Sequence, residues 1–151
     1  MKAMRLHAPG RSLQLDDVPL PAVEGTSLLV RVSACGVCRT DLHVVDGELP
    51  AAAHPGVPGH EVVGRVVAVG PGVREFRVGD RVGIPWLART CGQCDDCRCG
   101  LENLREKALF TGYTVDGGYA EYALADARFC LAIPDRYADA EAAPLLCAGL
   151  I

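Results

Sequence analysis

The sequence is poor in the features that mark several large classes of protein. Aromatic residues make up 5% of its 151 residues. No apolar run approaches the ~20 residues that a membrane-spanning helix requires. The net charge of −4 shows no basic excess, so nothing favours nucleic acid or a membrane surface as a partner. Residues 1–7 lack the apolar core of a secretory signal, and we therefore expect a cytoplasmic protein.

Glycine, proline and cysteine are frequent instead. The 17 glycines and 10 prolines favour short strands joined by tight turns over a helical bundle, and the length suits one domain. The eight cysteines are grouped, with two at 35 and 38, four between 91 and 99, and single ones at 130 and 147. In a cytoplasmic protein, such groups predict metal sites before disulfides.

Hydrophobic patterns predict a mainly β chain. Strands are expected at residues 27–34, 60–69, 73–84 (two short strands with a turn at 78–80), 119–124 and 129–133. The second of these is strongly apolar, with valine at 62, 63, 66, 67 and 69, which predicts a strand buried on both faces. A helix is expected to start within 138–143, capped by Asp135 or Asp139, and a loop is expected at 44–58.

Residues 35–43 concentrate two thiols, a cation, a hydroxyl, a carboxylate and an imidazole in Cys-Gly-Val-Cys-Arg-Thr-Asp-Leu-His. These groups suffice to hold a metal, move a proton and bind a phosphate. Taken singly, His60 would be a core histidine and Cys147 a buried thiol. The residue types alone do not connect these distant positions.

A second motif introduces a resemblance that connects them. Gly59-His60-Glu61, followed by Gly64 and Gly70, resembles the zinc signature of the zinc-dependent alcohol dehydrogenases of the medium-chain dehydrogenase/reductase superfamily. Four more segments are similar to that family in order and approximate spacing, at residues 38–43, 78–82, 116–122 and 145–149. The resemblance implies a GroES-like, partly open β-barrel with short helices.

Residues 1–151 are expected to form one GroES-like zinc-binding catalytic domain of this kind. Within it, residues 90–107 resemble the structural-zinc lobe, and the interdomain helix is expected to start near 138–151. The polar lobe has few core residues and needs a cross-link to fold. No Gly-x-Gly-x-x-Gly follows a strand, so the cofactor-binding Rossmann domain is absent from this chain. Cys35 and Cys130 are expected to pack in the core.

The resemblance assigns a catalytic zinc to Cys38, His60 and Cys147. Two thiolates and one imidazole, with a fourth position open, are a ligand set known for the catalytic zinc of alcohol dehydrogenases. Thr40 resembles the hydroxyl that hydrogen-bonds the substrate oxygen, and His43 resembles the histidine that relays the proton to solvent.

Three charged residues complete the implied site. Arg39 resembles a side chain that contacts the cofactor pyrophosphate, a role suited to a guanidinium. Asp41 resembles the carboxylate that orients the ligand histidine, here His60. Glu61 lies beside the metal in the family, and Trp86 resembles a substrate-pocket aromatic of some members. Outside this context, the three charges would be read as solvated loop residues.

The second cysteine cluster departs from the family. Cys91, Cys94 and Cys97 resemble the structural zinc ligands, but Arg105 stands where the family has its fourth cysteine. Three interpretations follow: a zinc site rebuilt with Cys99, a weak three-cysteine site, or a disordered lobe without zinc. Loss of one thiolate matters because a complete zinc site can fold such a lobe by itself.

The activity implied is the NAD- or NADP-linked oxidation of an alcohol to an aldehyde or ketone, and its reverse, by a zinc enzyme that is a dimer or tetramer at full length. The partner would be a small-molecule alcohol or aldehyde. We expect the isolated chain to be inactive, because the hydride-accepting half is missing. The alternative is a stand-alone zinc-binding or interaction module without turnover. A zinc-free reductase relative is disfavoured by the intact ligand set.

Overall fold

The computed structural model describes residues 1–49, 55–147 and 149. Its elements, in chain order, are β1 (Lys2–Arg5), β2 (Gln14–Asp17), β3 (Ser27–Gly36), α1 (Arg39–Asp46), β4 (Glu61–Val69), β5 (Arg81–Ile84), β6 (Leu87–Arg89), α2 (Asp95–Arg98), η1 (Glu102–Leu104), β7 (Leu109–Phe110), β8 (Tyr122–Asp126), η2 (Ala127–Phe129), β9 (Leu131–Ala132), α3 (Asp139–Ala142) and η3 (Ala143–Leu146). The loop expected at 44–58 and the helix expected near 138–151 each lie partly outside the described residues.

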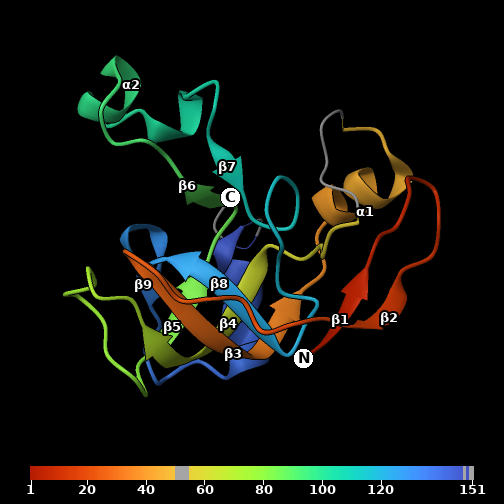
Figure 1. Cartoon of the computed structure of the whole chain (residues 1–151), viewed down its shortest axis with the longest axis horizontal. Coiled ribbons are helices and arrows are strands. Elements are labelled where there is room, and N and C mark those ends of the chain that lie inside the picture. The colour runs from red at the N-terminus through yellow and green to blue at the C-terminus, as the bar shows by residue number, and fades with distance from the viewer. Residues whose placement is uncertain (50–54, 148, 150–151) are drawn as a thin grey trace.

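A five-stranded antiparallel sheet with the order β8-β3-β4-β5-β9 forms the centre of the molecule (Figure 1). β1 pairs with β2, and β6 pairs with β7, as two smaller sheets. The described strands thus form a mainly β, partly open structure with short helices, as predicted. The strands expected at 119–124 and 129–133 appear as β8 and β9, the first shifted towards the C-terminus and the second shortened.

The core lies on both faces of β4. Val62 and Val66 pack in one apolar cluster with side chains of β3, β5 and β8. Val63 points to the opposite face and packs against Ala142 and Leu146 of the C-terminal helical turns. β4 is buried on both faces only in its first half, where residues 61–64 are all buried, and this explains the successive valines at 62 and 63. In its second half Arg65, Val67 and Val69 are exposed.

Residues 73–84 contain one strand, β5, where two were predicted. The segment before β5 is held in turns, with the N–H of Val73 donating to the carbonyl of Gly70 and that of Asp80 to Arg77. These local hydrogen bonds use the backbone groups that a first strand would need for a ladder.

The C-terminal helix is also shorter than expected, since α3 is a single turn that passes directly into η3. Neither Asp135 nor Asp139 caps it. Ala138 is the capping residue, and its N–H donates to the Glu141 carboxylate at 3.0 Å. The side chain of Glu141, the third residue of the helix, therefore caps the helix in place of a side chain at position 138.

α1 is a helix that the sequence patterns did not predict. Its capping residue is Cys38, an unusual choice, and the N–H of Cys38 donates to the Asp41 carboxylate at 2.8 Å. Gly47 ends the helix with a φ of 77°, a conformation that glycine adopts without steric cost. The helix places residues 39–43 on one turn of backbone.

The cysteine lobe extends away from the central sheet and joins it through β6 and β7 (Figure 1). Neither α2 nor η1 contains a buried residue. Apolar burial therefore contributes little to the helices of this lobe, in line with the expectation of a polar excursion. Among the described residues, no helix is long and apolar enough to cross a membrane.

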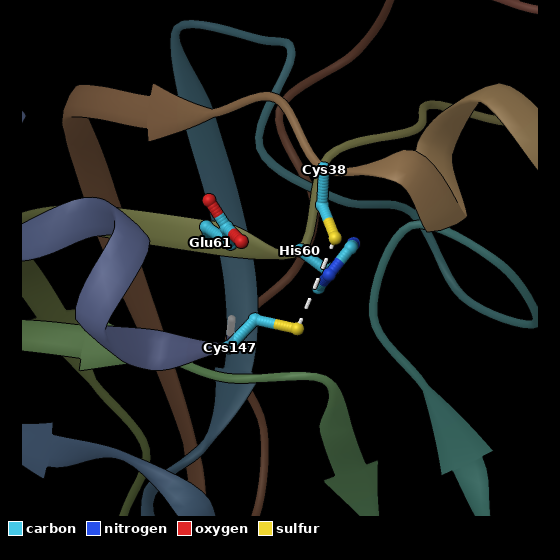
Figure 2. Close-up of side chains that lie close together, drawn as sticks. All are labelled: Cys38, His60, Glu61 and Cys147. Atoms are coloured by element: carbon cyan, nitrogen blue, oxygen red, sulfur yellow. Dashed lines mark hydrogen bonds between the residues drawn. The ribbon is translucent and has the colours of Figure 1, made fainter. Parts of the chain in front are cut away.

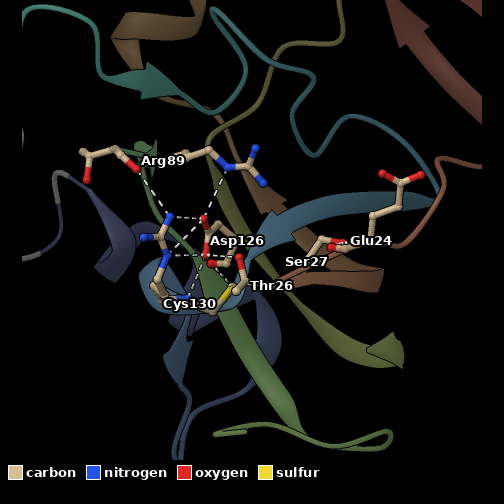
Figure 3. Close-up of polar contacts among 8 residues, drawn as sticks. Glu24, Thr26, Ser27, Arg89, Asp126 and Cys130 are labelled. Atoms are coloured by element: carbon tan, nitrogen blue, oxygen red, sulfur yellow. Dashed lines mark hydrogen bonds and ion pairs between the residues drawn. The ribbon is translucent and has the colours of Figure 1, made fainter. Parts of the chain in front are cut away.

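Asp126, at the end of β8, connects the sheet to the base of this lobe (Figure 3). Its side chain is 1% exposed. It accepts hydrogen bonds from Thr26 at 3.2 Å, from Arg89 at 3.3 Å and from Arg128 at 2.6 Å. Arg128 also donates to the carbonyl of Thr90, the residue before the first lobe cysteine. Burial alone would raise the pKa of Asp126, but the hydrogen bonds and charge of Arg128 hold that pKa below its usual range.

We expect Asp126→Asn to lower the free energy of unfolding by about 1–3 kcal/mol at pH 7, because charge-assisted hydrogen bonds are lost at a buried position. The folded pKa lies below the unfolded value of about 3.9, so this stabilisation is present above that value and is lost as the pH falls through the folded pKa. Urea unfolding of both proteins from pH 7 to pH 3 measures the difference. A difference that stays constant over this range would contradict the assignment.

Candidate metal centre

Four potential metal-binding side chains converge near the start of β4 (Figure 2). They are Cys38 before α1, His60 before β4, Glu61 at the first position of β4 and Cys147 after η3. One potential ligand atom from each lies within 4.8 Å of the others. The sulfurs of Cys38 and Cys147 are 4.0 Å apart. The fold therefore brings together the three residues that the family resemblance assigned to a catalytic zinc.

Asp41 holds two of these side chains in place. Its Oδ1 lies 2.9 Å from Nδ1 of His60, and the two side chains are 3% and 1% exposed. The same carboxylate accepts the backbone N–H groups of Cys38 at 2.8 Å and of Gly59 at 3.2 Å. One buried carboxylate thus links the capping residue of α1 to the segment that carries the histidine.

The second nitrogen of His60 is the informative atom. With Nδ1 donating to Asp41, the neutral ring presents the lone pair of Nε2. Nε2 is buried and has no hydrogen-bond partner. Such a group costs about 1–3 kcal/mol when it is left unsatisfied. A cation bound beside the two thiols would satisfy it.

The electrostatics of the cluster favour the charged forms of Cys38 and Asp41 and place negative charge around His60. Burial alone would raise the pKa of Cys38, but hydrogen bonds from Thr40 and Cys147 and the charge of His60 hold that pKa below its usual value. Burial would likewise raise the pKa of Asp41, which the contact with His60 lowers instead. The same contact raises the pKa of His60 against the opposing effect of burial. Asp41 is therefore an anion that fixes the histidine.

Two glycines allow the chain to pass close behind His60. The N–H of Gly117 donates to Val57 at 2.7 Å, and that of Gly118 donates to Gly59 at 2.8 Å. A Cβ on Gly117 would lie 2.1 Å from the Gly59 carbonyl oxygen. The Asp116-Gly117-Gly118 motif is thus explained by packing, because a side chain here would push away the segment that carries the histidine.

An aromatic group covers one side of the cluster. Trp86 meets the His60 ring edge-on, with ring centroids 5.0 Å apart. Phe110 and Tyr113 stack on Trp86 at 5.0 Å and 5.8 Å. Trp86 had been identified only by resemblance. Its two partners were missed, because no local pattern shows that they fold onto it.

The structure places the remaining predicted site residues along α1. The hydroxyl of Thr40 lies 3.9 Å from the sulfur of Cys38. His43, one turn further, pairs through Nδ1 with the carboxylate of Glu48. Arg39 is exposed at the start of the helix. Thr40 is the member of this set that reaches the candidate ligands.

The second cluster is built differently. The sulfurs of Cys91, Cys94 and Cys97 lie within 4.8 Å of one another, and Arg105 donates from Nε to Cys91 at 3.2 Å. Cys99 is exposed at the end of α2 and does not belong to the group that the described residues form. Hydrogen bonds from the backbone N–H groups of Gln93 and Cys94 lower the pKa of Cys91 to about 6, and the hydrogen bond from Arg105 is a smaller contribution in the same direction.

The two clusters differ in how well they suit zinc. Cys38, His60 and Cys147 offer three donors of the types that zinc prefers, together with a buried nitrogen that lacks a partner, so this site fits zinc with a fourth position open. The lobe offers three thiols and a guanidinium in contact with one of them. It does not fit the closed four-ligand site of a structural zinc.

Comparison with known proteins agrees with the fold. An alcohol dehydrogenase of Geobacillus stearothermophilus is 49% identical over 151 residues, which cover 99% of this chain and 45% of that protein. A cinnamyl alcohol dehydrogenase structure from Sorghum bicolor has a TM-score of 0.90 at 33% identity, covering 99% of this chain and 45% of that one. A cobalt- and zinc-bound thermostable alcohol dehydrogenase from Pyrobaculum aerophilum has a TM-score of 0.85 at 34% identity, covering 96% and 43%.

The chain therefore spans less than half the length of these relatives. Residues 24–135, most of the chain, match the family described as the alcohol dehydrogenase GroES-like domain. Together with the central antiparallel sheet, this match shows that the chain belongs to the alcohol dehydrogenase GroES-like domain family.

Proposed function

We propose that this chain is the catalytic domain of a zinc-dependent alcohol dehydrogenase that oxidises an alcohol to an aldehyde or ketone with NAD or NADP, and catalyses the reverse reaction. The observation that carries the proposal is the buried, unpartnered Nε2 of His60 beside two thiols. The relatives called alcohol dehydrogenases support it, as does the zinc named in the Pyrobaculum aerophilum structure.

Cys38, His60 and Cys147 would hold the metal, and the bound zinc would supply a Lewis acid that lowers the pKa of an alcohol hydroxyl towards neutrality. Asp41 keeps the proton of His60 on Nδ1, so that Nε2 stays available as a donor. Two thiolates balance the charge of a divalent ion. Glu61 adds a buried carboxylate next to the three donors.

Thr40 and His43 would remove the proton of the alcohol. They are three residues apart on α1 and therefore neighbours on the helix surface. The Thr40 hydroxyl can accept a proton and donate its own, and an imidazole exchanges protons with solvent near neutral pH. Glu48, paired with Nδ1 of His43, orients that ring. Arg39, exposed at the start of the same helix, would contact the cofactor pyrophosphate.

The stacked Trp86, Phe110 and Tyr113 would form an apolar wall of the substrate site. The Trp86 ring lies beside the ligand histidine and would exclude water from one side of it, and Phe110 and Tyr113 stack on Trp86. An apolar or aromatic substituent on the alcohol suits such a wall better than a charged one.

The hydride must go to a cofactor, and no glycine fingerprint for a dinucleotide occurs in residues 1–151. We therefore propose that the activity belongs to a longer protein containing this chain, and that the chain alone has no turnover. As in the family resemblance, we propose that this protein is a dimer or tetramer.

The zinc content of the protein tests the assignment of His60 as a ligand. The chain is expected to retain zinc through dialysis, and His60→Ala is expected to remove one ion per chain, because two thiols alone make an incomplete site. The exposed His7 serves as a matched control, and His7→Ala should keep the parental zinc content. Elemental analysis measures the ion, and circular dichroism checks that each variant is folded. Equal zinc in both variants would rule out the assignment of His60.

The affinity for zinc tests the role of Asp41 in holding His60. Asp41→Asn is expected to weaken zinc binding by about 10- to 100-fold, the usual effect of removing the partner of a ligand histidine. Competition with a chromogenic chelator measures the affinity. Asp46→Asn, which changes an exposed carboxylate on the same helix, is the control. An Asp41 variant that binds zinc as tightly as this control would contradict the role given to Asp41.

Cofactor reduction by the full-length protein distinguishes an enzyme from a binding module. A full-length protein that contains this chain is expected to reduce NAD or NADP when given primary or secondary alcohols. Thr40→Ala should lower kcat/KM by about 10²- to 10⁴-fold, while Thr40→Ser, which keeps the hydroxyl, should stay close to the parent. If the full-length protein binds zinc through His60 but reduces neither cofactor, the chain is a zinc-binding module without turnover.

A further inference from the structure

The sulfurs of the cysteine lobe have the spacing of three corners of a tetrahedron. With Zn–S bonds of about 2.3 Å, neighbouring sulfurs of a tetrahedral site are about 3.8 Å apart. The Cys91–Cys97 and Cys94–Cys97 distances are 3.9 Å and 3.4 Å. The three sulfurs therefore lie close enough together for one metal ion, and these two distances are near those of a tetrahedral site.

A cation already lies against this group. Arg105 replaces the fourth cysteine of the family pattern, and its Nε donates to the sulfur of Cys91 at 3.2 Å. A guanidinium stays charged at any pH at which a protein is folded, and it can donate hydrogen bonds but cannot bind a metal. Zinc bound to Cys91 would lie within a few ångströms of this positive charge, and the two cations would repel each other.

No other donor restores the missing corner. Cys99 lies outside the group, and no carboxylate or imidazole of the described residues joins it. A second guanidinium, that of Arg128, interacts electrostatically with Cys97. The lobe thiols therefore face positive charge supplied by the protein itself.

We propose that Arg105 replaces the structural metal in this chain: its guanidinium cross-links the lobe through Cys91, and the lobe holds no tightly bound zinc. The contact joins residues 14 positions apart and so closes the loop that carries the three cysteines. The helices α2 and η1 contain no buried residue, so the lobe depends on such a cross-link.

Zinc content tests the first half of the proposal in a His60→Ala background, where zinc at the other cluster does not contribute. The parent of this background is expected to hold no zinc after dialysis. Adding Arg105→Cys completes four thiolates and should bring one ion per chain. Adding Arg105→Ser, which removes the guanidinium without supplying a thiolate, should bring none. Zinc in the parent of this background that is lost on adding Cys91→Ser would overturn the proposal.

Hydrogen exchange tests the second half. Arg105→Gln is expected to speed amide exchange within residues 90–107 by roughly fivefold, the factor that corresponds to the loss of about one net hydrogen bond. Arg98→Gln removes an exposed guanidinium from α2 and should leave exchange unchanged. Equal exchange in the two variants would show that Arg105 does not cross-link the lobe. These readouts do not require turnover, so they stand or fall independently of the proposed activity.

Discussion

The contact between the Asp41 carboxylate and His60 is the interaction on which the rest of the site depends. The Asp41 carboxylate lies in the interior, where an unpaired carboxylate would be costly. It accepts hydrogen bonds from the imidazole and from two backbone N–H groups. Those two N–H groups belong to Cys38 and Gly59, so one side chain ties α1 to the start of β4. Without this contact, the position of the Cys38 sulfur relative to the His60 nitrogen would not be fixed.

The surrounding fold explains why this anchor can be buried. The first four residues of β4 are buried on both faces of the strand, so solvent does not reach the residues that directly follow His60. Because Gly117 and Gly118 have no side chain, the segment that contains them packs closely on the backbone of Gly59. The ring of Trp86 covers one side of the His60 ring. Packing, rather than the donor residues themselves, therefore leaves Nε2 of His60 dry and without a partner. A dry, unpaired acceptor binds a cation better than a hydrated one.

Sequence patterns predicted the elements whose signal is local and continuous. β3 and β4 are rich in apolar, largely β-branched residues. The helix α1 was missed because its capping residue is a cysteine and its stabilising contact comes from Asp41, which also contacts His60. Hydrophobic periodicity cannot join Cys38 to Cys147 across the chain; only the family resemblance did so, and the fold then placed their sulfurs 4.0 Å apart. The stacking of Phe110 and Tyr113 on Trp86 is a tertiary event with no local signature.

The two cysteine-containing clusters show how the charge around a thiol group decides what it can hold. Beside Cys38 and Cys147 lies a buried acceptor without a donor, and the nearby carboxylates add negative charge, so this cluster suits a cation from outside. Beside Cys91 the protein supplies its own cation through Arg105. The sulfurs lie at similar distances in both clusters, and the difference lies in the groups beside them: a buried imidazole and carboxylates at the first cluster, a guanidinium at the second. A cysteine pattern therefore indicates where a metal can bind, while the fourth corner decides whether one is needed.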